Sequence, residues 1–171
     1  MNKLLPIDPS LIKDNPFQLI GTDWMLLTAG SLKSFNTMTA SYGALGELWH
    51  KKIAYCFVRP QRYTYEFMEK NTCFTMSFFD ESYRDVLKLC GTKSGRNIDK
   101  MKGIGLTPVE GHCGSVYFDE ARLVLECRKI YYQDIDPTKF VDPNIQSEYT
   151  NDYHRAYIGE IVRALSRKQM D

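Results

Sequence analysis

The amino-acid sequence predicts an antiparallel β-barrel with short helical inserts, and two observations support this fold class. Aromatic residues make up 13% of the chain, with 11 Tyr and 9 Phe, and such residues are favoured in strands. Six or more segments have the pattern of strands, whereas two or three have that of short helices. Because these segments do not alternate as strand, helix and strand, a doubly wound parallel sheet is disfavoured and a barrel is the better interpretation.

Four segments in the first half of the chain are expected to be strands. They follow residues 1–16, which we expect to form an irregular arm because prolines recur there. Residues 24–30 (WMLLTAG) have the apolar character of a buried strand, and residues 36–41 (NTMTAS) alternate like a half-exposed one. The third and fourth strands are residues 53–58 (IAYCFV) and 72–79 (TCFTMSFF).

Two short helices are expected around the fourth strand. Residues 62–71 (RYTYEFMEKN) form the first, with Thr64 placed to cap its N-terminus. Residues 80–91 (DESYRDVLKLCG) form the second, which Ser82 can cap and Gly91 can end. Both helices are short enough to be inserts between strands rather than a layer of their own.

The last third of the chain is predicted to return to strands. Residues 97–103 are expected to add one further helical turn, and residues 114–135 to form a hairpin or a long strand pair. Residues 155–168 fit either a helical face or a strand. We predict a strand, because Gly159 lowers helix stability and the Ile, Val and Tyr residues around it favour sheets.

Composition and charge exclude several classes of protein. The 171 residues fit a single domain, residues 1–171. The formal net charge of +1 argues against a nucleic-acid partner, which requires a basic surface. No apolar run is long enough for a membrane span, and the first ten residues are too broken for a signal peptide.

The cysteines and histidines do not have the spacing of a metal site. The cysteines stand at positions 56, 73, 90, 113 and 127, and the histidines at 50, 112 and 154. An odd cysteine count without a C-x-x-C pair argues against both a zinc site and a disulfide framework. We therefore expect buried free thiols, no metal and a reducing cytoplasm.

Familiar nucleotide and nucleophile motifs are missing. The stretch 103–111 (GIGLTPVEG) begins like a dinucleotide fingerprint, but Pro108 occupies the third glycine position and cannot open the required helix. The sequence contains neither a Walker A motif nor G-x-S-x-G. A function must therefore come from other clusters of residues.

The first such cluster is residues 34–49 (SFNTMTASYGALGELW), which is rich in small and hydroxyl residues and carries no basic residue. Small side chains leave backbone groups approachable, and hydroxyls can donate or accept hydrogen bonds. A heteroaromatic ring with polar edges needs a wall of this kind. The alternative is an ordinary edge strand with a polar face.

Two further clusters are cationic. Residues 58–64 (VRPQRYT) join a predicted strand to a predicted helix, where helix N–H groups and the forked side chains of Arg59 and Arg62 could bind a phosphate. Residues 91–100 form a loop that contains Lys93, Ser94, Gly95, Arg96 and Lys100 and could close over an anion. The alternatives are a solvated turn and a flexible loop.

Four motifs in this order resemble the flavin reductase-like proteins, in the flavoredoxin branch of the FMN-binding split barrels. The motifs are NTMTASYGALGELW (36–49), VRPQRYTYEFMEKN with FTMSFF (58–79), SGRNIDKMKGIGLTPV (94–109) and YHRAYIGEIV (153–162). The resemblance covers about residues 15–165. It implies an antiparallel split barrel, usually a homodimer, with FMN in a groove near the subunit interface.

The resemblance also implies roles for particular residues. The ring of FMN would lie along Asn36, Thr37, Met38, Thr39, Ala40, Ser41 and Tyr42. Its ribityl phosphate would bind Arg59, Arg62, Tyr63 and Thr64 together with Ser94, Gly95, Arg96 and Lys100. His154 matches a histidine beside the flavin or nicotinamide and is the candidate catalytic residue. Tyr42 stands where close relatives often have tryptophan.

The expected function is that of an NAD(P)H-dependent flavin reductase, with FMN as cofactor and NADH or NADPH as electron donor. The alternative is a flavoredoxin-type carrier that passes electrons from FMN to a redox protein partner. A third possibility is a barrel that has lost its cofactor. The retained Arg, Ser and Lys clusters argue against this possibility.

Overall fold

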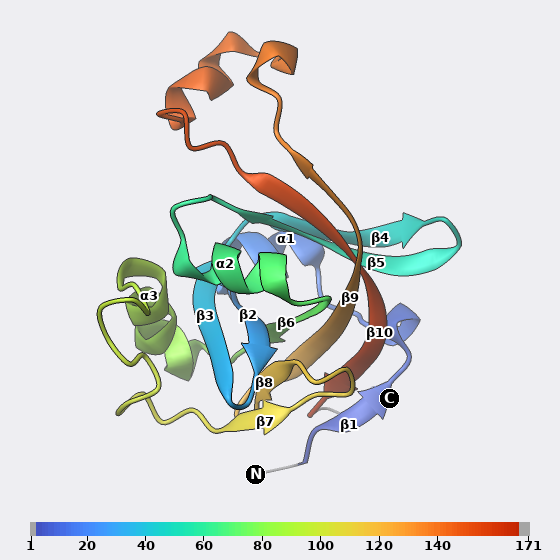
Figure 1. Ribbon diagram of the computed structural model, residues 1–171. Helices are drawn as coiled ribbons and strands as arrows, with labels where there is room; N and C mark the ends of the chain where they lie inside the picture. Colours follow the sequence, from blue (N-terminus) through green and yellow to red (C-terminus); the bar gives the residue numbers. More distant parts are fainter. Residues whose placement is uncertain (1–2, 168–171) are drawn as a thin grey trace.

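In the part of the chain that the structure describes, the fold is built from ten strands, most of which belong to one antiparallel sheet (Figure 1). It is described by a computed structural model of residues 3–167. The strands are β1 (Leu5–Ile7), β2 (Met25–Ser31), β3 (Ser34–Ala40), β4 (Gly43–Leu48), β5 (Lys51–Val58), β6 (Cys73–Phe78), β7 (Pro108–Glu110), β8 (Val116–Phe118), β9 (Leu123–Asp134) and β10 (Arg155–Ser166). The main sheet has the order β3-β2-β6-β9-β10-β5-β4, β1 adds to β10, and β7 and β8 form a separate pair.

The helices are short, and the two longer ones lie beside β3. The helices are α1 (Pro16–Gln18), α2 (Tyr63–Lys70) and α3 (Arg84–Thr92), with a π-helical turn over Leu19–Asp23 and 3-10 turns elsewhere. Both α2 and α3 pack against β3 and β2. Between β9 and β10 the chain leaves the barrel as a projecting arm with short helical turns, drawn in orange and red in Figure 1.

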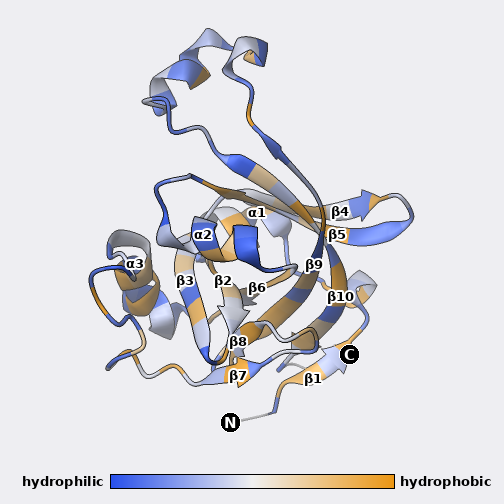
Figure 2. Cartoon of the chain, viewed as in Figure 1, coloured by the Kyte–Doolittle hydropathy of each residue, from blue (hydrophilic) through white to orange (hydrophobic). Residues whose placement is uncertain are grey.

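The sheet is buried on both faces, because successive side chains of a strand point to opposite sides. On β2, Met25 and Leu27 belong to a core inside the barrel, whereas Leu26 belongs to a second core. The second core also contains Leu87 from α3 and Phe118 from β8. Figure 2 shows the resulting concentration of apolar residues on the strands of the barrel, and a more hydrophilic projecting arm.

The predicted antiparallel β class is confirmed, as are the strands expected in the first half of the chain and the strand over β10. The expectation that residues 1–16 are irregular is wrong in one respect, because β1 pairs with β10, with Leu5 opposite Ser166. The strand over β3 is mostly buried rather than half exposed, since α2 and α3 cover it. β4 was not predicted, because its glycines weaken the strand pattern.

The predicted helix boundaries need correction. Thr64 lies inside α2, whose N-cap is Arg62, and its buried hydroxyl accepts a hydrogen bond from Asn36 Nδ2 at 2.7 Å. Ser82 lies within a 3-10 turn, and Gly91 stands in the last turn of α3 before the C-cap Lys93. Residues 97–103 form turns without a helix. Tertiary hydrogen bonds, which the sequence pattern does not report, decide these termini.

Residues 114–135 contain two strands, as expected, but the strands do not pair with each other. β8 pairs with β7, whereas β9 pairs with β6 and β10. The β7–β8 hairpin therefore lies against the main sheet as a separate unit.

The expectation of buried free thiols holds for three of the five cysteines and is wrong for the other two. Cys73 and Cys113 form a disulfide, with their Cα atoms 6.4 Å apart. The two residues are 40 positions apart in the sequence, so only the folding of the β7–β8 hairpin onto β6 brings them together. Cys56, Cys90 and Cys127 are free and buried. Among the helices of residues 3–167, none has both the length and the apolar composition needed to cross a membrane.

Gly159 allows β10 to pass close to the core, which yields a test of the fold. A Cβ atom at Gly159 would lie 2.6 Å from Phe74 Cζ and 2.7 Å from Cys127 Cβ. We expect Gly159→Ala to lower the free energy of unfolding by about 1–3 kcal/mol through overpacking, measured by urea denaturation. Gly46→Ala is the matched control, because nothing lies within 4 Å of its added Cβ. Equal stability of the two variants would contradict the proposed close packing.

Candidate functional site

The site begins at the unpaired edge of β3. Strand β3 ends the main sheet and pairs only with β2 within residues 3–167. In an antiparallel pair, the backbone groups of alternate residues point away from the partner strand. The Thr37 carbonyl points to the outer edge, where it accepts a hydrogen bond from Lys100 Nζ at 2.7 Å. By the same alternation, the backbone of Thr39 faces this edge.

Two adjoining hollows lie between this edge, α2 and the loop after α3. Their volumes are ≈ 450 Å³ and ≈ 160 Å³, and Asn36, Tyr63, Gly95 and Lys100 line both. The larger hollow is also lined by Ser34, Phe35, Thr37, Phe67, Arg96, Asn97, Ile98, Asp99 and Met101, and the smaller by Met38, Gln61, Arg62, Thr64, Thr92, Lys93 and Ser94. Two cationic segments far apart in the sequence therefore meet beside β3.

Lys100 is a buried cation within this site. Its side chain is 6% exposed, and its Nζ donates to Thr37 O and to Cys90 O, the latter at 3.0 Å. Burial, opposed by Cys90 and reinforced by the nearby charge of Arg62, lowers the pKa of Lys100 to about 8. At neutral pH the ammonium remains mostly charged.

Arg62 is the second cation of the site. Its Nη1 donates to the carbonyl of Gly91, in the last turn of α3, at 2.9 Å, and burial lowers its pKa. Neither Arg62 nor Lys100 has an ion pair with a carboxylate among the described residues. Two partly or fully buried positive charges thus repel each other at the wall of a hollow, and a bound anion would relieve this repulsion.

The segment between α3 and β7, residues 93–107, carries Lys93, Arg96 and Lys100 and is called the cationic loop below. Gly95 brings this loop close to β3. A Cβ atom at this position would lie 2.0 Å from Asn36 Oδ1 and 3.2 Å from Tyr63 Cδ1. The loop is fastened to α2 by Arg96, which pairs with Glu66 at 2.5 Å and lies over the Tyr63 ring. Arg96 therefore positions the loop, and its charge is already balanced by Glu66.

The two threonine hydroxyls of β3 are bonded within the protein rather than directed into the hollows. Thr37 Oγ1 lies 2.8 Å from Thr28 Oγ1, and Thr39 Oγ1 donates to Leu87 O on α3. Met38 and Ala40 belong to the barrel core. What the strand offers to a ligand is therefore mainly its backbone edge.

A second group of predicted residues lies near the start of β10. His154 is 7% exposed, and its ring packs edge-on against Tyr42 and Phe57, with centroid distances of 5.8 Å and 6.4 Å. Its Nδ1 lies 2.9 Å from the hydroxyl of Tyr149, on the projecting arm. Burial, followed by the charge of Arg59, lowers the pKa of His154, so the imidazole is neutral at neutral pH.

Arg59 belongs to this second group and not to the cationic hollows. Its Nη1 pairs with Asp152 at 2.6 Å, its Nη2 donates to Glu148 O, and its guanidinium lies over Tyr149. These contacts fasten the base of the arm. Its charge is balanced by Asp152, whose pKa is lowered first by the Thr150 N–H and then by Arg59.

The rings of Tyr42, Phe57, Tyr149 and His154 form an aromatic group. A separate hollow of ≈ 370 Å³ lies beside it. Ser41, Tyr42 and Phe57 line it together with Pro16, Phe17, Ile20, Gly21 and Gly43. Tyr42 is 58% exposed and Phe17 86% exposed. Sequence reasoning did not single out Phe17, Phe57 or Tyr149. The aromatic excess of the chain was a signal for them, but nothing in the sequence places them beside His154.

The structure thus divides the predicted site residues into two groups. Ten line the cationic hollows: Asn36, Thr37, Met38, Arg62, Tyr63, Thr64, Ser94, Gly95, Arg96 and Lys100. Ser41, Tyr42, Arg59 and His154 form or adjoin the aromatic group, and Thr39 and Ala40 lie on β3 between the two. Strand geometry separates Thr37 from Ser41 by about 13 Å, so one elongated ligand could reach both groups.

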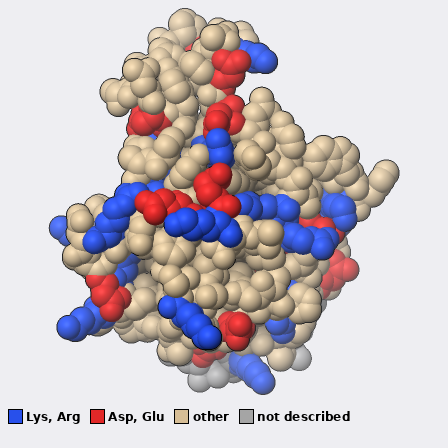
Figure 3. Space-filling model, viewed as in Figure 1, with Lys and Arg blue, Asp and Glu red and all other residues tan. Residues whose placement is uncertain are grey.

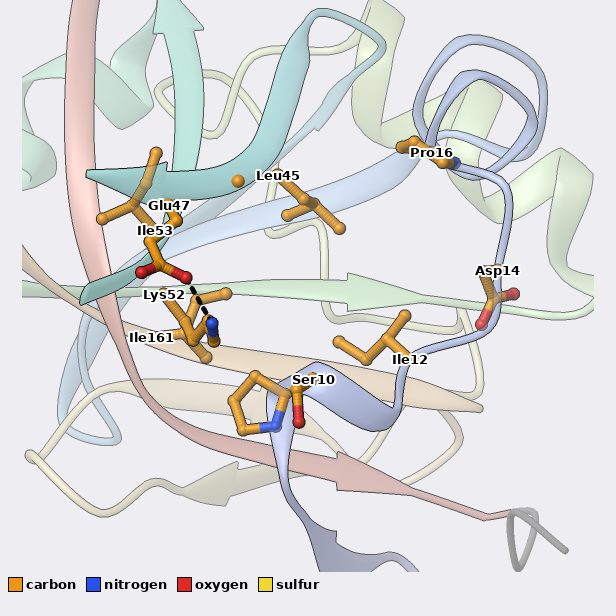
Figure 4. Close-up of a pocket in the computed structure, with 11 residues that line it drawn as sticks. Ser10, Ile12, Asp14, Pro16, Leu45, Glu47, Lys52, Ile53 and Ile161 are labelled. Carbon is orange, nitrogen blue, oxygen red and sulfur yellow. Dashed lines mark hydrogen bonds and ion pairs between the residues drawn. The ribbon is translucent and has the colours of Figure 1, made fainter. Parts of the chain in front are cut away.

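A hollow of similar size lies elsewhere, between the N-terminal arm and the β4–β5 hairpin (Figure 4). Ile12, Leu45, Ile53 and Ile161 give it an apolar floor, and Lys52 and Glu47 form an ion pair at 2.5 Å at its edge. It contains none of the predicted site residues. Its only described cation is already paired, so it lacks the features that would bind an anion.

Comparison with known proteins gives one family and a set of related folds. The model of a family described as "Flavin reductase like domain" matches residues 18–171. No curated protein matches the chain by sequence. Solved structures with a similar fold are distant in sequence, so they show the shared split-barrel fold alone.

Three of these structures illustrate the likeness. An FMN-binding domain of a flavin reductases-like enzyme from Shewanella baltica is 17% identical, with a TM-score of 0.70 over 97% of this chain and 78% of that one. The flavoredoxin of Desulfovibrio vulgaris is 24% identical, with a TM-score of 0.65 over 92% and 75%. An NADH:FAD oxidoreductase from Streptomyces globisporus is 15% identical, with a TM-score of 0.64 over 84% and 74%.

The burial of Lys100 predicts a pH dependence of stability. Its pKa in the folded chain, about 8, lies below the 10.5 of an exposed lysine, so the folded state binds fewer protons between these values. The free energy of unfolding should therefore gain a contribution of up to about 3 kcal/mol as the pH rises from 8 to 10.5. Measured by urea unfolding across this range, the gain should disappear in Lys100→Met and persist in Lys93→Met, where an exposed lysine is replaced.

Proposed function

This chain belongs to the flavin reductase-like family, and on that premise we propose that it binds FMN and transfers electrons from NADH or NADPH to it. The observation that carries the proposal is the pair of cations, Arg62 and Lys100, which face a hollow without a carboxylate partner among the described residues. Other buried or half-buried arginines of the molecule are balanced by acids. A site of this kind fits the phosphate of a flavin mononucleotide.

The phosphate end of the ligand would lie in the smaller hollow. Arg62 and Lys100 supply the charge, and Ser94 lies beside them in the same wall. Gly95 keeps the loop close to Asn36, where a larger residue would fill the space. The first residues of α2, Tyr63 and Thr64, line the same hollow, so the N-terminus of this helix also favours an anion there.

The ring of the flavin would lie along the unpaired edge of β3 towards Tyr42. Edge strands carry backbone donors and acceptors without partners, and a flavin ring has donors and acceptors along its rim. Tyr42 and Phe57 add apolar surface at the far end. A ligand in this position would therefore cover both groups of predicted residues at once.

A bound flavin would supply the redox chemistry, as the group to which a nicotinamide gives a hydride. The chain then has to hold the two rings in contact and exclude water. Neutral His154, fixed by Tyr149, is proposed to contact the reacting rings without carrying a competing charge. Tyr42, which is exposed beside it, would shape the face that receives the nicotinamide.

The second candidate is a flavoredoxin-type carrier that passes electrons to a redox protein partner. The exposed aromatic side chains of Phe17 and Tyr42 beside the aromatic hollow favour it, because exposed apolar patches mark surfaces for protein contact. The same surface, together with the unpaired edges of β3 and β4, suits a homodimer. We also propose a cytoplasmic location. Under both candidates, FMN occupies the same site.

Replacing Arg62 tests the phosphate site. Arg62→Ala removes a charge-assisted contact, and we expect it to weaken FMN binding by roughly 1.5–3 kcal/mol, measured by quenching of flavin fluorescence. Riboflavin lacks the phosphate, so its affinity should not change. Lys102→Ala replaces an exposed lysine of the cationic loop that lines neither hollow, and it should leave FMN affinity unchanged. An equal loss for FMN and riboflavin would place Arg62 outside the phosphate site.

Anaerobic titration with nicotinamide distinguishes the two candidates. FMN bound to the purified protein should bleach at its visible bands when NADH or NADPH is added, if the protein is a reductase. His154→Ala should slow this bleaching by about tenfold or more, because a group that orients the reacting rings is lost. Flavin that stays oxidised with both nucleotides, but is reduced by a low-potential redox protein, would establish the carrier instead.

A further inference from the structure

We propose that Cys73 and Cys113 are a thiol–disulfide exchange site for dithiol reductants, and that their redox state sets the rigidity of the loop that carries Lys100. The disulfide joins the buried start of β6 to the exposed turn of the β7–β8 hairpin. It lies outside both groups of predicted site residues. The part of the proposal that concerns ligand affinity rests on the proposed function, whereas the exchange itself does not.

The β7–β8 hairpin is attached to the rest of the molecule by few polar contacts. It forms its own two-stranded sheet, and no backbone–backbone hydrogen bond joins residues 108–118 to the main sheet within the described chain. Two hydrogen bonds from or to side chains reach it: Thr75 Oγ1 donates to Val116 O, and the His112 N–H donates to Glu126. Apart from the apolar contacts of β8, the disulfide is thus its main tether.

The turn that carries Cys113 closes over a buried carboxylate. Glu126 is fully buried, and Arg163 lies 3.5 Å from its Oε1. A Cβ atom at Gly111 would lie 2.4 Å from Glu126 Oε2, so the turn fits tightly against this group. The turn is closed by a backbone hydrogen bond, which Gly111 N–H donates to Ser115 O at 2.6 Å. Without the disulfide, only this turn's own hydrogen bonds and its contact with Glu126 would keep it closed.

The same hairpin anchors the far end of the cationic loop. Residues 93–107 run from the C-terminus of α3 to β7 and carry Lys100. At their end, Leu106 shares the second core with Phe118 of β8, and Thr107 O accepts a hydrogen bond from Asp119 N at 2.9 Å. A loosened hairpin therefore loosens one end of the segment that places Lys100 against Thr37.

The exchange is chemically balanced with a dithiol as the reductant. One thiolate of the reagent attacks the Sγ of Cys113, which belongs to an exposed residue, and the Cys73 thiolate leaves and takes up a proton. The second thiol of the reagent then displaces Cys113, and the reagent becomes a cyclic disulfide. Two electrons and two protons pass to the cysteine pair. Disulfides in reducing compartments are typically redox-sensing or catalytic.

Hydrogen exchange with mass spectrometry tests the proposal on the full chain. Protein treated with oxidised dithiothreitol should contain the Cys73–Cys113 bond, and reduced dithiothreitol should release two alkylatable thiols at these positions. Reduction should accelerate exchange at least fivefold in residues 93–118 and leave residues 155–166 unchanged. FMN affinity should fall at least about fivefold, the low end of the range for coupled sites.

Variants separate the disulfide from other effects of the reagent. Cys113→Ser and Cys73→Ser should behave like the reduced protein under both conditions. Cys56→Ala, which replaces a free buried thiol, should keep the full response. Unchanged exchange in residues 93–107 on reduction, or FMN affinity that is equal in the two redox states, would overturn the proposal. If neither form binds FMN, the proposed function fails, and the exchange rates of residues 93–107 alone decide the switch.

Discussion

The unpaired edge of β3 is the constraint on which the rest of this structure depends. A sheet that ends in a long buried strand must satisfy or cover the backbone groups of that edge. Here α2, α3 and the loop after α3 provide the cover, and Lys100 donates a hydrogen bond to the outward-pointing carbonyl of Thr37. The edge is covered only in part, and the hollows beside it are where the candidate site lies.

Charge balance separates the structural cations from those available to a ligand. Figure 3 shows basic and acidic side chains interleaved in a belt across one face. Within such pairs, Arg155 is held by Glu69 and Asp134, and Arg96 by Glu66. Ion pairs near the surface contribute little to stability. Each of them nevertheless neutralises the positive charge of its arginine, so that charge is not available to bind a ligand. Arg62 and Lys100 differ from these arginines, because both have lost hydration through burial and neither has a carboxylate partner within residues 3–167.

The hairpin and the projecting arm each connect a distant segment to this site. Tyr149 of the arm forms a hydrogen bond with His154, and the ion pair between Arg59 and Asp152 holds the base of the arm. The β7–β8 hairpin anchors the end of the cationic loop and is itself tethered by the disulfide. Both units lie outside the main sheet, so the barrel supplies a rigid frame while smaller units set the positions of the site residues.

The sequence by itself determined the fold class, the positions of most strands along the chain and the residues of the cationic clusters. These follow from local patterns, since alternation, β-branched residues and glycine placement act over a few neighbouring residues. It even indicated a strand over β10, where Gly159 is explained by the close approach of Phe74. It also indicated both Arg62 and Lys100, because each stands in a motif with a local reason to bind an anion.

Only the tertiary structure decided which of these residues act together. Arg59 and Arg62 are three positions apart, yet one is paired with Asp152 on the arm and the other faces the hollow beside Lys100. Thr39 and Thr64 direct their hydroxyls to Leu87 and Asn36, and Cys73 meets Cys113. These outcomes depend on contacts between residues far apart in the chain. Local sequence patterns do not specify such contacts, because they reflect only neighbouring residues.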